Sequence, residues 1–191
     1  MPIEVELKAW VEDEDALVAQ LMAGADYVGR SEKRDVYYRR ADEDPDSIDP
    51  GRSALPRLRQ VDQRSFVTLK RKRRVDGAEV NDEIEFAVDP TEAAEAFLAA
   101  LGFLPLIAKQ KDTRLFRDRD ERRLSYELNV LAGLGTFIEL ELLLDSEASE
   151  GEVTAARAIL AERMARLGVA ESAIEPRYYI ELLRGRSGET P

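Results

Sequence analysis

Two acids and a base alternate along the first strand-like stretch of the chain, IEVELKAW at residues 3–10. Side chains alternate between the two faces of a β-strand, so Glu4, Glu6 and Lys8 share one face and the apolar residues between them share the other. The apolar face predicts burial against a core. The opposite face brings two carboxylates and an ammonium group within reach of one point, which suits the binding of a cation together with an anion.

The same alternation recurs along later strand-like stretches and keeps acids apart from bases. A single strand of this kind indicates only a solvent-facing surface, and such surfaces normally mix in threonine, serine and glutamine. Here the charged residues occur as like-charged pairs on alternate positions. The acid pairs are Glu4/Glu6, Glu83/Glu85 and Glu139/Glu141, and the base pairs are Arg57/Arg59, Lys70/Lys72 and Lys109/Lys111.

A closed antiparallel β-barrel with a charged lumen accounts for this pattern, because its charged faces would line the interior and its apolar faces would pack under helices. Carboxylates at that density repel one another unless a divalent cation lies between them. Clustered lysines and arginines repel one another unless a polyanion lies between them. A metal ion with a polyphosphate satisfies both sets. The alternative is a lumen of salt bridges that binds no ligand.

The strands that carry these charges are mostly joined as hairpins. Roughly eight strands and three or four helices are expected, which predicts an α+β fold and excludes a parallel doubly wound sheet. Residues 35–40 are predicted to form one strand, and residues 104–111 and 113–118 two separate strands. The segment 40–55 is predicted to be a long loop, because it holds two prolines and a glycine. The predicted helices cover residues 12–24, 90–102, 149–168 and 175–185.

The composition limits the chemistry that the chain can use. Its 191 residues predict a single domain over residues 1–186, followed by a disordered tail at 187–191. The chain holds no cysteine and no histidine, so it lacks thiolate ligands and the commonest general base. Any metal must therefore bind through oxygen atoms, which favours Mg²⁺ or Mn²⁺ over Zn²⁺.

The overall charge limits the partners. A formal net charge of -11 argues against a broad nucleic-acid surface, although a local cationic pocket remains possible and would select small anions. No signal peptide is recognised at the start of the chain, and no apolar run is long enough to cross a bilayer. We therefore predict a cytoplasmic protein that binds neither nucleic acid nor membranes.

Taken together, the motifs resemble those of the CYTH superfamily, the triphosphate tunnel metalloenzymes. EVELK at residues 4–8 is similar to the Glu-x-Glu-x-Lys that opens these proteins. The stretches ALPRLRQ, FVTLKRK, NDEIEF and AKQK look like its later strands in the same order, and LAGLGTFIELE like its Gly-Leu-Gly turn and second Glu-x-Glu. The resemblance covers nearly the whole chain. It implies an eight-stranded antiparallel tunnel, Mg²⁺ or Mn²⁺, and a homodimer.

The ending EPRYYIELL is similar to the tail of class IV adenylyl cyclases, with Arg177 and Tyr179 in register. The sequence departs from the family pattern at four positions, which affects the expected substrate more than the tunnel itself. Asn129 replaces a frequent aspartate and Asn81 replaces an arginine; Arg39 and Arg114 are the other two departures.

The resemblance and the alternation together assign roles to the lumenal residues. Glu4, Glu6 and Lys8 are the expected catalytic residues. The metal would be held by Glu4, Glu6, Glu83, Glu85, Glu139 and Glu141. A small triphosphate, either ATP or inorganic triphosphate, would be held by Lys8, Arg57, Arg59, Lys70, Lys72, Lys109, Lys111 and Arg177.

The reaction implied first is that of a class IV adenylyl cyclase, which converts ATP into cyclic AMP and pyrophosphate. The second candidate is a triphosphatase acting on inorganic triphosphate, thiamine triphosphate or a nucleotide. The third is a non-catalytic module that binds polyphosphate. The base would be a metal-activated water, a carboxylate or a lysine with a lowered pKa, and the sequence does not distinguish among these.

Overall fold

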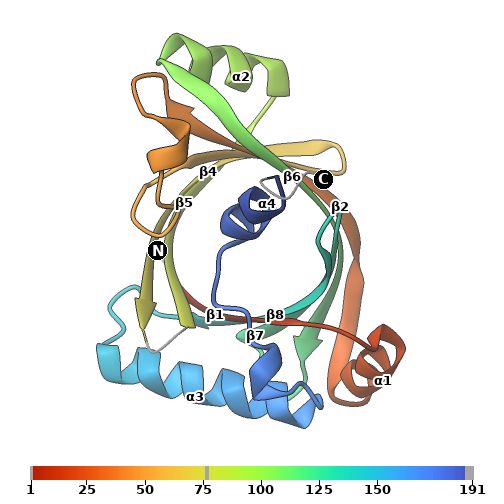
Figure 1. Cartoon of the computed structure of the whole chain (residues 1–191). Helices are drawn as coiled ribbons and strands as arrows, with labels where there is room; N and C mark the ends of the chain where they lie inside the picture. Colours follow the sequence, from red (N-terminus) through yellow and green to blue (C-terminus); the bar gives the residue numbers. More distant parts are fainter. Residues whose placement is uncertain (1, 76–77, 188–191) are drawn as a thin grey trace.

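The computed structural model describes residues 2–75 and 78–187, in which eight strands close into an antiparallel barrel (Figure 1). The first strand closes the barrel by pairing with both β5 and β8, and the order around it is β1-β5-β4-β3-β2-β6-β7-β8. The predicted α+β barrel is therefore confirmed. The strands are β1 (Ile3–Trp10), β2 (Ala25–Arg40), β3 (Pro56–Val61), β4 (Arg64–Val75), β5 (Ala78–Val88), β6 (Phe103–Asp118), β7 (Leu124–Leu131) and β8 (Gly135–Leu144).

Helices flank the barrel. Where the N-terminus of a described helix is capped by a side chain, the capping residue is an aspartate or a serine. Asp13 accepts a hydrogen bond from the backbone of Ala16, and Ser149 forms a capping box with Glu152. None of the described helices is both long enough and apolar enough to cross a membrane. The helices are α1 (Glu14–Gly24), α2 (Thr91–Ala100), α3 (Glu150–Arg166) and α4 (Tyr179–Ser187), with short 3₁₀ turns η1 (Pro45–Ser47) and η2 (Glu171–Ala173).

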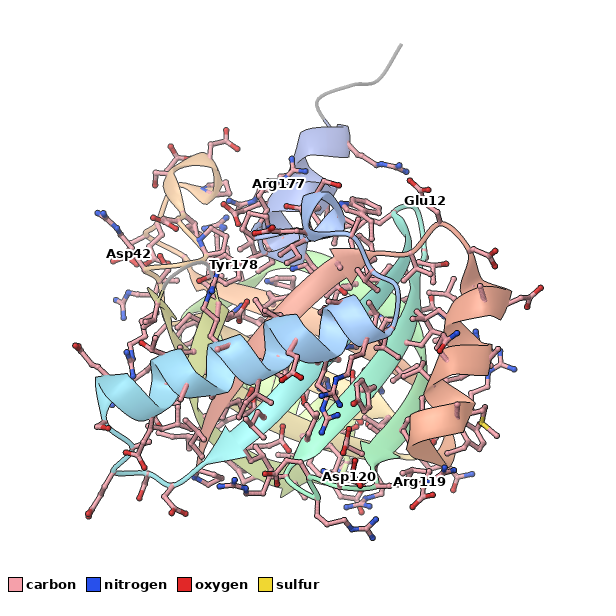
Figure 2. The ribbon with its side chains drawn as sticks, turned by 90° about the horizontal axis from the view of Figure 1, so that it is seen from below. Glu12, Asp42, Arg119, Asp120, Arg177 and Tyr178 are labelled. Atoms are coloured by element: carbon pink, nitrogen blue, oxygen red, sulfur yellow. The ribbon has the colours of Figure 1, made fainter. Side chains whose placement is uncertain are left out.

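The main hydrophobic core lies outside the barrel, between its outer face and α3. Val5 and Leu140, which alternate with lumenal charges, are fully buried there, as are Val153 and Leu160 on the helix. Figure 2 shows α3 lying across β1 and its neighbours. The apolar side chains on alternate strand positions thus point outward and pack against a helix. The barrel interior is left for the charged side chains.

Long strands β2 and β6 correct the sequence prediction. Residues 104–111 and 113–118 form the single strand β6, and β2 begins at Ala25 rather than Asp35. The break expected at Asp112 does not occur, because β2 pairs with β6 without interruption there, with Glu32 opposite Asp112. Nε and Nη2 of Arg30 also donate hydrogen bonds to the carboxylate of Asp112. A register shift between Tyr27 and Gly29 lets the paired strands continue.

The C-terminal helix also differs from its prediction. It begins at Tyr179 and not around Pro176, because the chain before it is held to β1. Ile174 forms an isolated bridge with Ala9, and the backbone nitrogen of Glu175 donates to the carbonyl of Lys8 at 2.8 Å. The predicted disordered tail overlaps this helix at Ser187. The remaining tail positions, 188–191, lie outside the described residues.

Asp118 joins the end of β6 to β7 and to α3. Its buried carboxylate accepts hydrogen bonds from the hydroxyl of Tyr126 at 2.5 Å and from the backbone of Asp120 and Glu121 at 2.9 and 2.8 Å. Arg163 of α3 approaches it to 3.6 Å. Burial raises the pKa of Asp118, but the hydrogen bonds and Arg163 outweigh it, so its pKa lies below the usual value.

Asp118→Asn is therefore expected to reduce the free energy of unfolding by about 1–3 kcal/mol at pH 7. Because the folded-state pKa is depressed, the contribution of the carboxylate is complete above the unfolded pKa of about 4 and is lost as the pH falls through the folded pKa. Urea titrations at pH 7 and pH 3 should show the difference between variant and wild type shrinking at the lower pH. The exposed Asp120→Asn serves as the charge-matched control, and an equal loss there would contradict the assignment.

Candidate functional site

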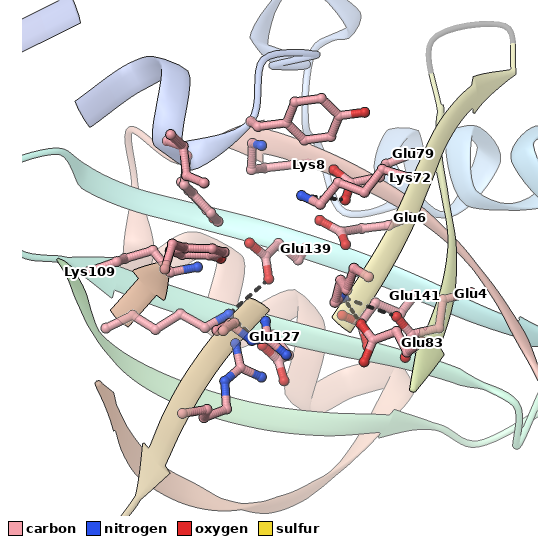
Figure 3. Close-up of a pocket in the computed structure, with 18 of the residues that line it drawn as sticks. Glu4, Glu6, Lys8, Lys72, Glu79, Glu83, Lys109, Glu127, Glu139 and Glu141 are labelled. Atoms are coloured by element: carbon pink, nitrogen blue, oxygen red, sulfur yellow. Dashed lines mark hydrogen bonds and ion pairs between the residues drawn. The ribbon is translucent and has the colours of Figure 1, made fainter. Parts of the chain in front are cut away.

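The barrel encloses a cavity of about 200 Å³ whose walls are mainly charged (Figure 3). Strand alternation directs these side chains inward, and antiparallel pairing places residues of distant segments at the same depth. Lys8, for example, lies opposite Glu139 in the β1–β8 register. The predicted site residues that line the cavity are Glu4, Glu6, Lys8, Arg57, Arg59, Lys70, Lys72, Glu83, Glu85, Lys109, Lys111, Glu139 and Glu141.

Arg177 is the predicted substrate ligand that does not line this cavity. Its guanidinium group pairs with Glu175 at 2.6 Å, and its side chain is 59% exposed. Only its backbone reaches inward, where its carbonyl accepts a hydrogen bond from Lys8 Nζ at 2.6 Å. Glu175, two residues before Arg177, accepts hydrogen bonds from the guanidinium and so keeps it at the surface (Figure 2).

Several residues that lie in or beside the cavity were not assigned to the site from the sequence. Glu79 and Glu127 line the cavity with the predicted acids, Tyr37 lines it as well, and Asp35 is buried beside the bases. Glu79 has the same parity as Glu83 on β5, so extending the alternation by two steps would have found it. Glu127 lies between Tyr126 and Leu128 on β7, so the same alternation of apolar and charged residues would have indicated it.

The basic part of the site is held by three buried acids, Asp35 on β2, Glu127 on β7 and Glu139 on β8. Asp35 accepts two hydrogen bonds from Arg59, at 2.7 and 2.9 Å, and pairs with Lys109 at 3.2 Å. Lys111 lies between Glu127 at 3.0 Å and Glu139 at 3.1 Å and is 4% exposed. Burial lowers the pKa of this lysine, but the two carboxylates outweigh it and hold the pKa above its usual value.

The acidic part is only partly neutralised. Lys70 pairs with Glu4 at 3.3 Å and also contacts Glu83, whereas Glu6 and Glu141 form no ion pair with any described residue. Burial, together with the charges of Glu127 and Glu4, raises the pKa of Glu141 to about 8. Burial and neighbouring carboxylates also raise the pKa of Glu6 well above its usual value. The cavity therefore contains more carboxylate than its described cations compensate.

This excess fits a hard divalent cation. Carboxylate oxygens of Glu127, Glu139 and Glu141 lie within 4.8 Å of one another. Glu141 brings a carboxylate without an ion-pair partner among the described residues to Glu127 and Glu139, which share Lys111. Oxygen-only donors match the preference of Mg²⁺ and Mn²⁺, and no described residue is a histidine or cysteine that would favour a softer metal. The acidic cluster can thus hold a metal ion, with Glu127 added to the predicted ligands.

The start of α4 closes one side of the cavity. Tyr178, Tyr179 and Ile180 line it, and Figure 1 shows α4 within the ring of strands. Ile180 packs with Tyr37 and with Ile48 and Leu55 of the 40–55 loop, which therefore lies against α4. Burial alone raises the pKa of Tyr37, but nearby positive charges, that of Lys109 first, outweigh it and lower the pKa to about 7.

Comparison with known proteins agrees with this geometry. Residues 2–179 match the CYTH domain family. A protein of Methanocaldococcus jannaschii named "Putative adenylate cyclase MJ0240" is 26% identical over 181 residues, covering 94% of this chain and 98% of the relative. The PH1012 protein of Pyrococcus horikoshii OT3 has a similar structure (TM-score 0.75, 26% identity, 94% and 98% coverage). So does a conserved hypothetical protein of Pyrococcus furiosus (TM-score 0.77, 25% identity, 94% and 99% coverage).

Proposed function

Because this chain belongs to the CYTH domain family, we propose that it is a metal-dependent enzyme that acts on a triphosphate inside the barrel. The observation that carries the proposal is the composition of the cavity. It holds two buried carboxylates, Glu6 and Glu141, that form no ion pair within the described part of the chain, together with a set of lysines and arginines. A metal ion and a polyphosphate compensate both groups at once, which a lumen of salt bridges alone does not.

We assign Mg²⁺ or Mn²⁺ to the acidic cluster of Glu127, Glu139 and Glu141, with Glu4 and Glu6 beside it and Glu83 and Glu85 on the adjoining wall. When bound, the metal would neutralise charge on the phosphate oxygens. The lysines and arginines hold the substrate by charge-assisted hydrogen bonds and exclude water from it. Catalysis then rests mainly on the positioning of the reacting groups.

The reaction we favour is that of an adenylyl cyclase. The 3′-hydroxyl oxygen of ATP attacks the α-phosphorus, the bond to the β-phosphate breaks, pyrophosphate leaves, and the hydroxyl proton passes to a base in the cavity. The name of the M. jannaschii relative and the tail resemblance support this choice. The nucleoside would lie at the end of the cavity formed by Tyr37 and Ile180, where the lining is aromatic and apolar.

The size of the cavity favours a triphosphatase as the second candidate. The cavity volume of about 200 Å³ lies below the roughly 300–1,000 Å³ of typical small-molecule pockets. A whole nucleotide would need α4 to move, whereas inorganic triphosphate would not. In that reaction a water oxygen attacks the terminal phosphorus and the adjoining anhydride bond breaks.

We propose one domain over residues 1–186 that works as a cytoplasmic homodimer and binds small triphosphates rather than nucleic acid or membranes. The net charge of -11 supports the exclusion of polyanions, and the exposed apolar side chains of Ile84, Phe86, Phe97 and Leu101 support self-association. Sedimentation as a single chain would contradict the dimer.

Product analysis by ³¹P NMR tests the reaction. Purified protein is incubated with ATP and, separately, with inorganic triphosphate, first with Mg²⁺ and then with Mn²⁺. We expect cyclic AMP and pyrophosphate from ATP. Release of orthophosphate, above all from inorganic triphosphate, would replace the cyclase by the triphosphatase. Binding without turnover of either compound would leave a non-catalytic polyphosphate module.

A further inference from the structure

The ring of Tyr179 lies against two lysines that come from different walls of the barrel. Lys8 Nζ of β1 is 4.4 Å from the ring centroid, and Lys109 Nζ of β6 is 4.7 Å from it. Two strands, β7 and β8, separate β1 from β6 around the barrel. A single side chain at the first position of α4 therefore contacts cations that the barrel itself does not bring together.

These two lysines differ from the other lumenal lysines in how their charges are compensated. Lys70, Lys72 and Lys111 each pair with carboxylates of their own. Among the described residues, no carboxylate oxygen lies within 4.0 Å of Lys8 Nζ, which donates to a backbone carbonyl instead. Among the same described residues, Asp35 is the single carboxylate that pairs with Lys109, and Asp35 also pairs with Arg59.

An aromatic face stabilises an ammonium group without cancelling its charge. The attraction comes from the quadrupole of the ring and strengthens when the cation is desolvated, as it is for Lys8 at 6% exposure. A carboxylate partner adds a full negative charge that an incoming anion must compete with. Lysines held by a ring consequently keep more of their positive field for phosphate oxygens.

The ring is fixed by its own packing. Tyr179 meets Phe137 edge to face, with the ring centroids 5.1 Å apart, and Phe137 packs on Trp10 at 4.0 Å. The indole nitrogen of Trp10 donates to Glu175 at 3.0 Å. Leu182, one turn later on α4, completes the cluster. The position of the ring is thus set by contacts that do not involve the lysines.

We propose that Tyr179 is a positioning residue, whose ring holds Lys8 and Lys109 at the cavity with their charges available to the phosphate groups of the substrate. This inference rests on the proposed function, because it gives the two lysines a phosphate to bind. The first residue of α4 would then contribute to the affinity of the barrel for the phosphate groups of the substrate. The proposal concerns the aromatic ring, so Tyr179→Phe, which removes only the hydroxyl beside Glu139, should keep both lysines in place.

Calorimetric titration with inorganic triphosphate and Mg²⁺ tests the proposal on the full chain. Tyr179→Leu is expected to weaken binding about tenfold, and Tyr179→Phe to stay within about twofold of wild type. Leu182→Ala is the matched control, because it disturbs the same apolar cluster but touches neither lysine. It should lower the melting temperature while leaving the affinity within about twofold.

A second measurement needs no ligand. The side-chain NMR signals of Lys8 and Lys109 should carry a ring-current shift that Tyr179→Phe and Leu182→Ala retain. Tyr179→Leu should remove it for Lys8 and reduce it for Lys109, whose Nζ also lies 5.7 Å from the ring centroid of Tyr37. Equal weakening of triphosphate binding in Tyr179→Leu and Leu182→Ala, or unchanged lysine signals in Tyr179→Leu, would overturn the inference while the proposed function stood. Failure of the wild type to bind triphosphate would overturn the proposed function and this inference with it.

Discussion

Glu6→Gln combined with Glu141→Gln is expected to lower metal-dependent turnover at least about a hundredfold while the fold is retained. Loss of groups that merely orient metal ligands commonly costs 10–100-fold, so removing two charges from the acidic cluster should cost more. The fold should survive because neither carboxylate forms an ion pair with a described residue, and the amide is similar in size. Burial first, and then neighbouring carboxylates, raise the pKa of both groups, so the charged form of each is unfavourable without a bound cation.

Turnover, Mn²⁺ affinity and thermal unfolding in chelator should be measured together on this double variant. Glu147→Gln is the control for a lost surface charge, because Glu147 is exposed and lies outside the cavity. Turnover in the double variant close to that of the control would refute the metal assignment. A collapse of thermal stability in chelator would instead show that the two carboxylates are structural.

Lys111→Met should have the largest effect on stability. Removing this ammonium leaves the buried Glu139 without an ion-pair partner among the described residues and leaves Glu127 with Lys33 alone. Breaking a buried ion pair in this way commonly costs about 3–5 kcal/mol. Urea unfolding in chelator should show a loss of this size. Mg²⁺ should restore part of it, because a divalent cation can occupy the space between the same carboxylates.

Lys33→Met is the matched comparison for this loss. Lys33 also pairs with Glu127, at 2.6 Å, but its removal leaves that carboxylate paired with Lys111. The cost should therefore be clearly smaller and insensitive to Mg²⁺. Equal losses in the two variants, or a Lys111→Met protein that Mg²⁺ does not stabilise, would mean that Lys111 and a metal ion do not serve the same carboxylates.

The sequence alone was enough to predict that the like-charged pairs on the strands face the interior of the barrel. Strand alternation is a local property, so the placement of Glu4, Glu6 and Lys8 on one face follows from neighbouring residues alone. Segregation of acids from bases, with apolar residues between them, then indicated a charged interior and a core outside the barrel. Val5 and Leu140, buried beneath α3, bear this out.

The partners of each charge were decided only by the tertiary structure. Lys111 meets Glu127 and Glu139, and Tyr179 meets Lys8 and Lys109, because strand register and barrel closure bring separate segments to the same depth. Arg177, which resemblance assigned to the substrate, is instead paired with Glu175 at the surface. Periodicity specifies the face of a strand but carries no information about register between strands, so the alternation could assign residues to the lumen but not their contacts within it.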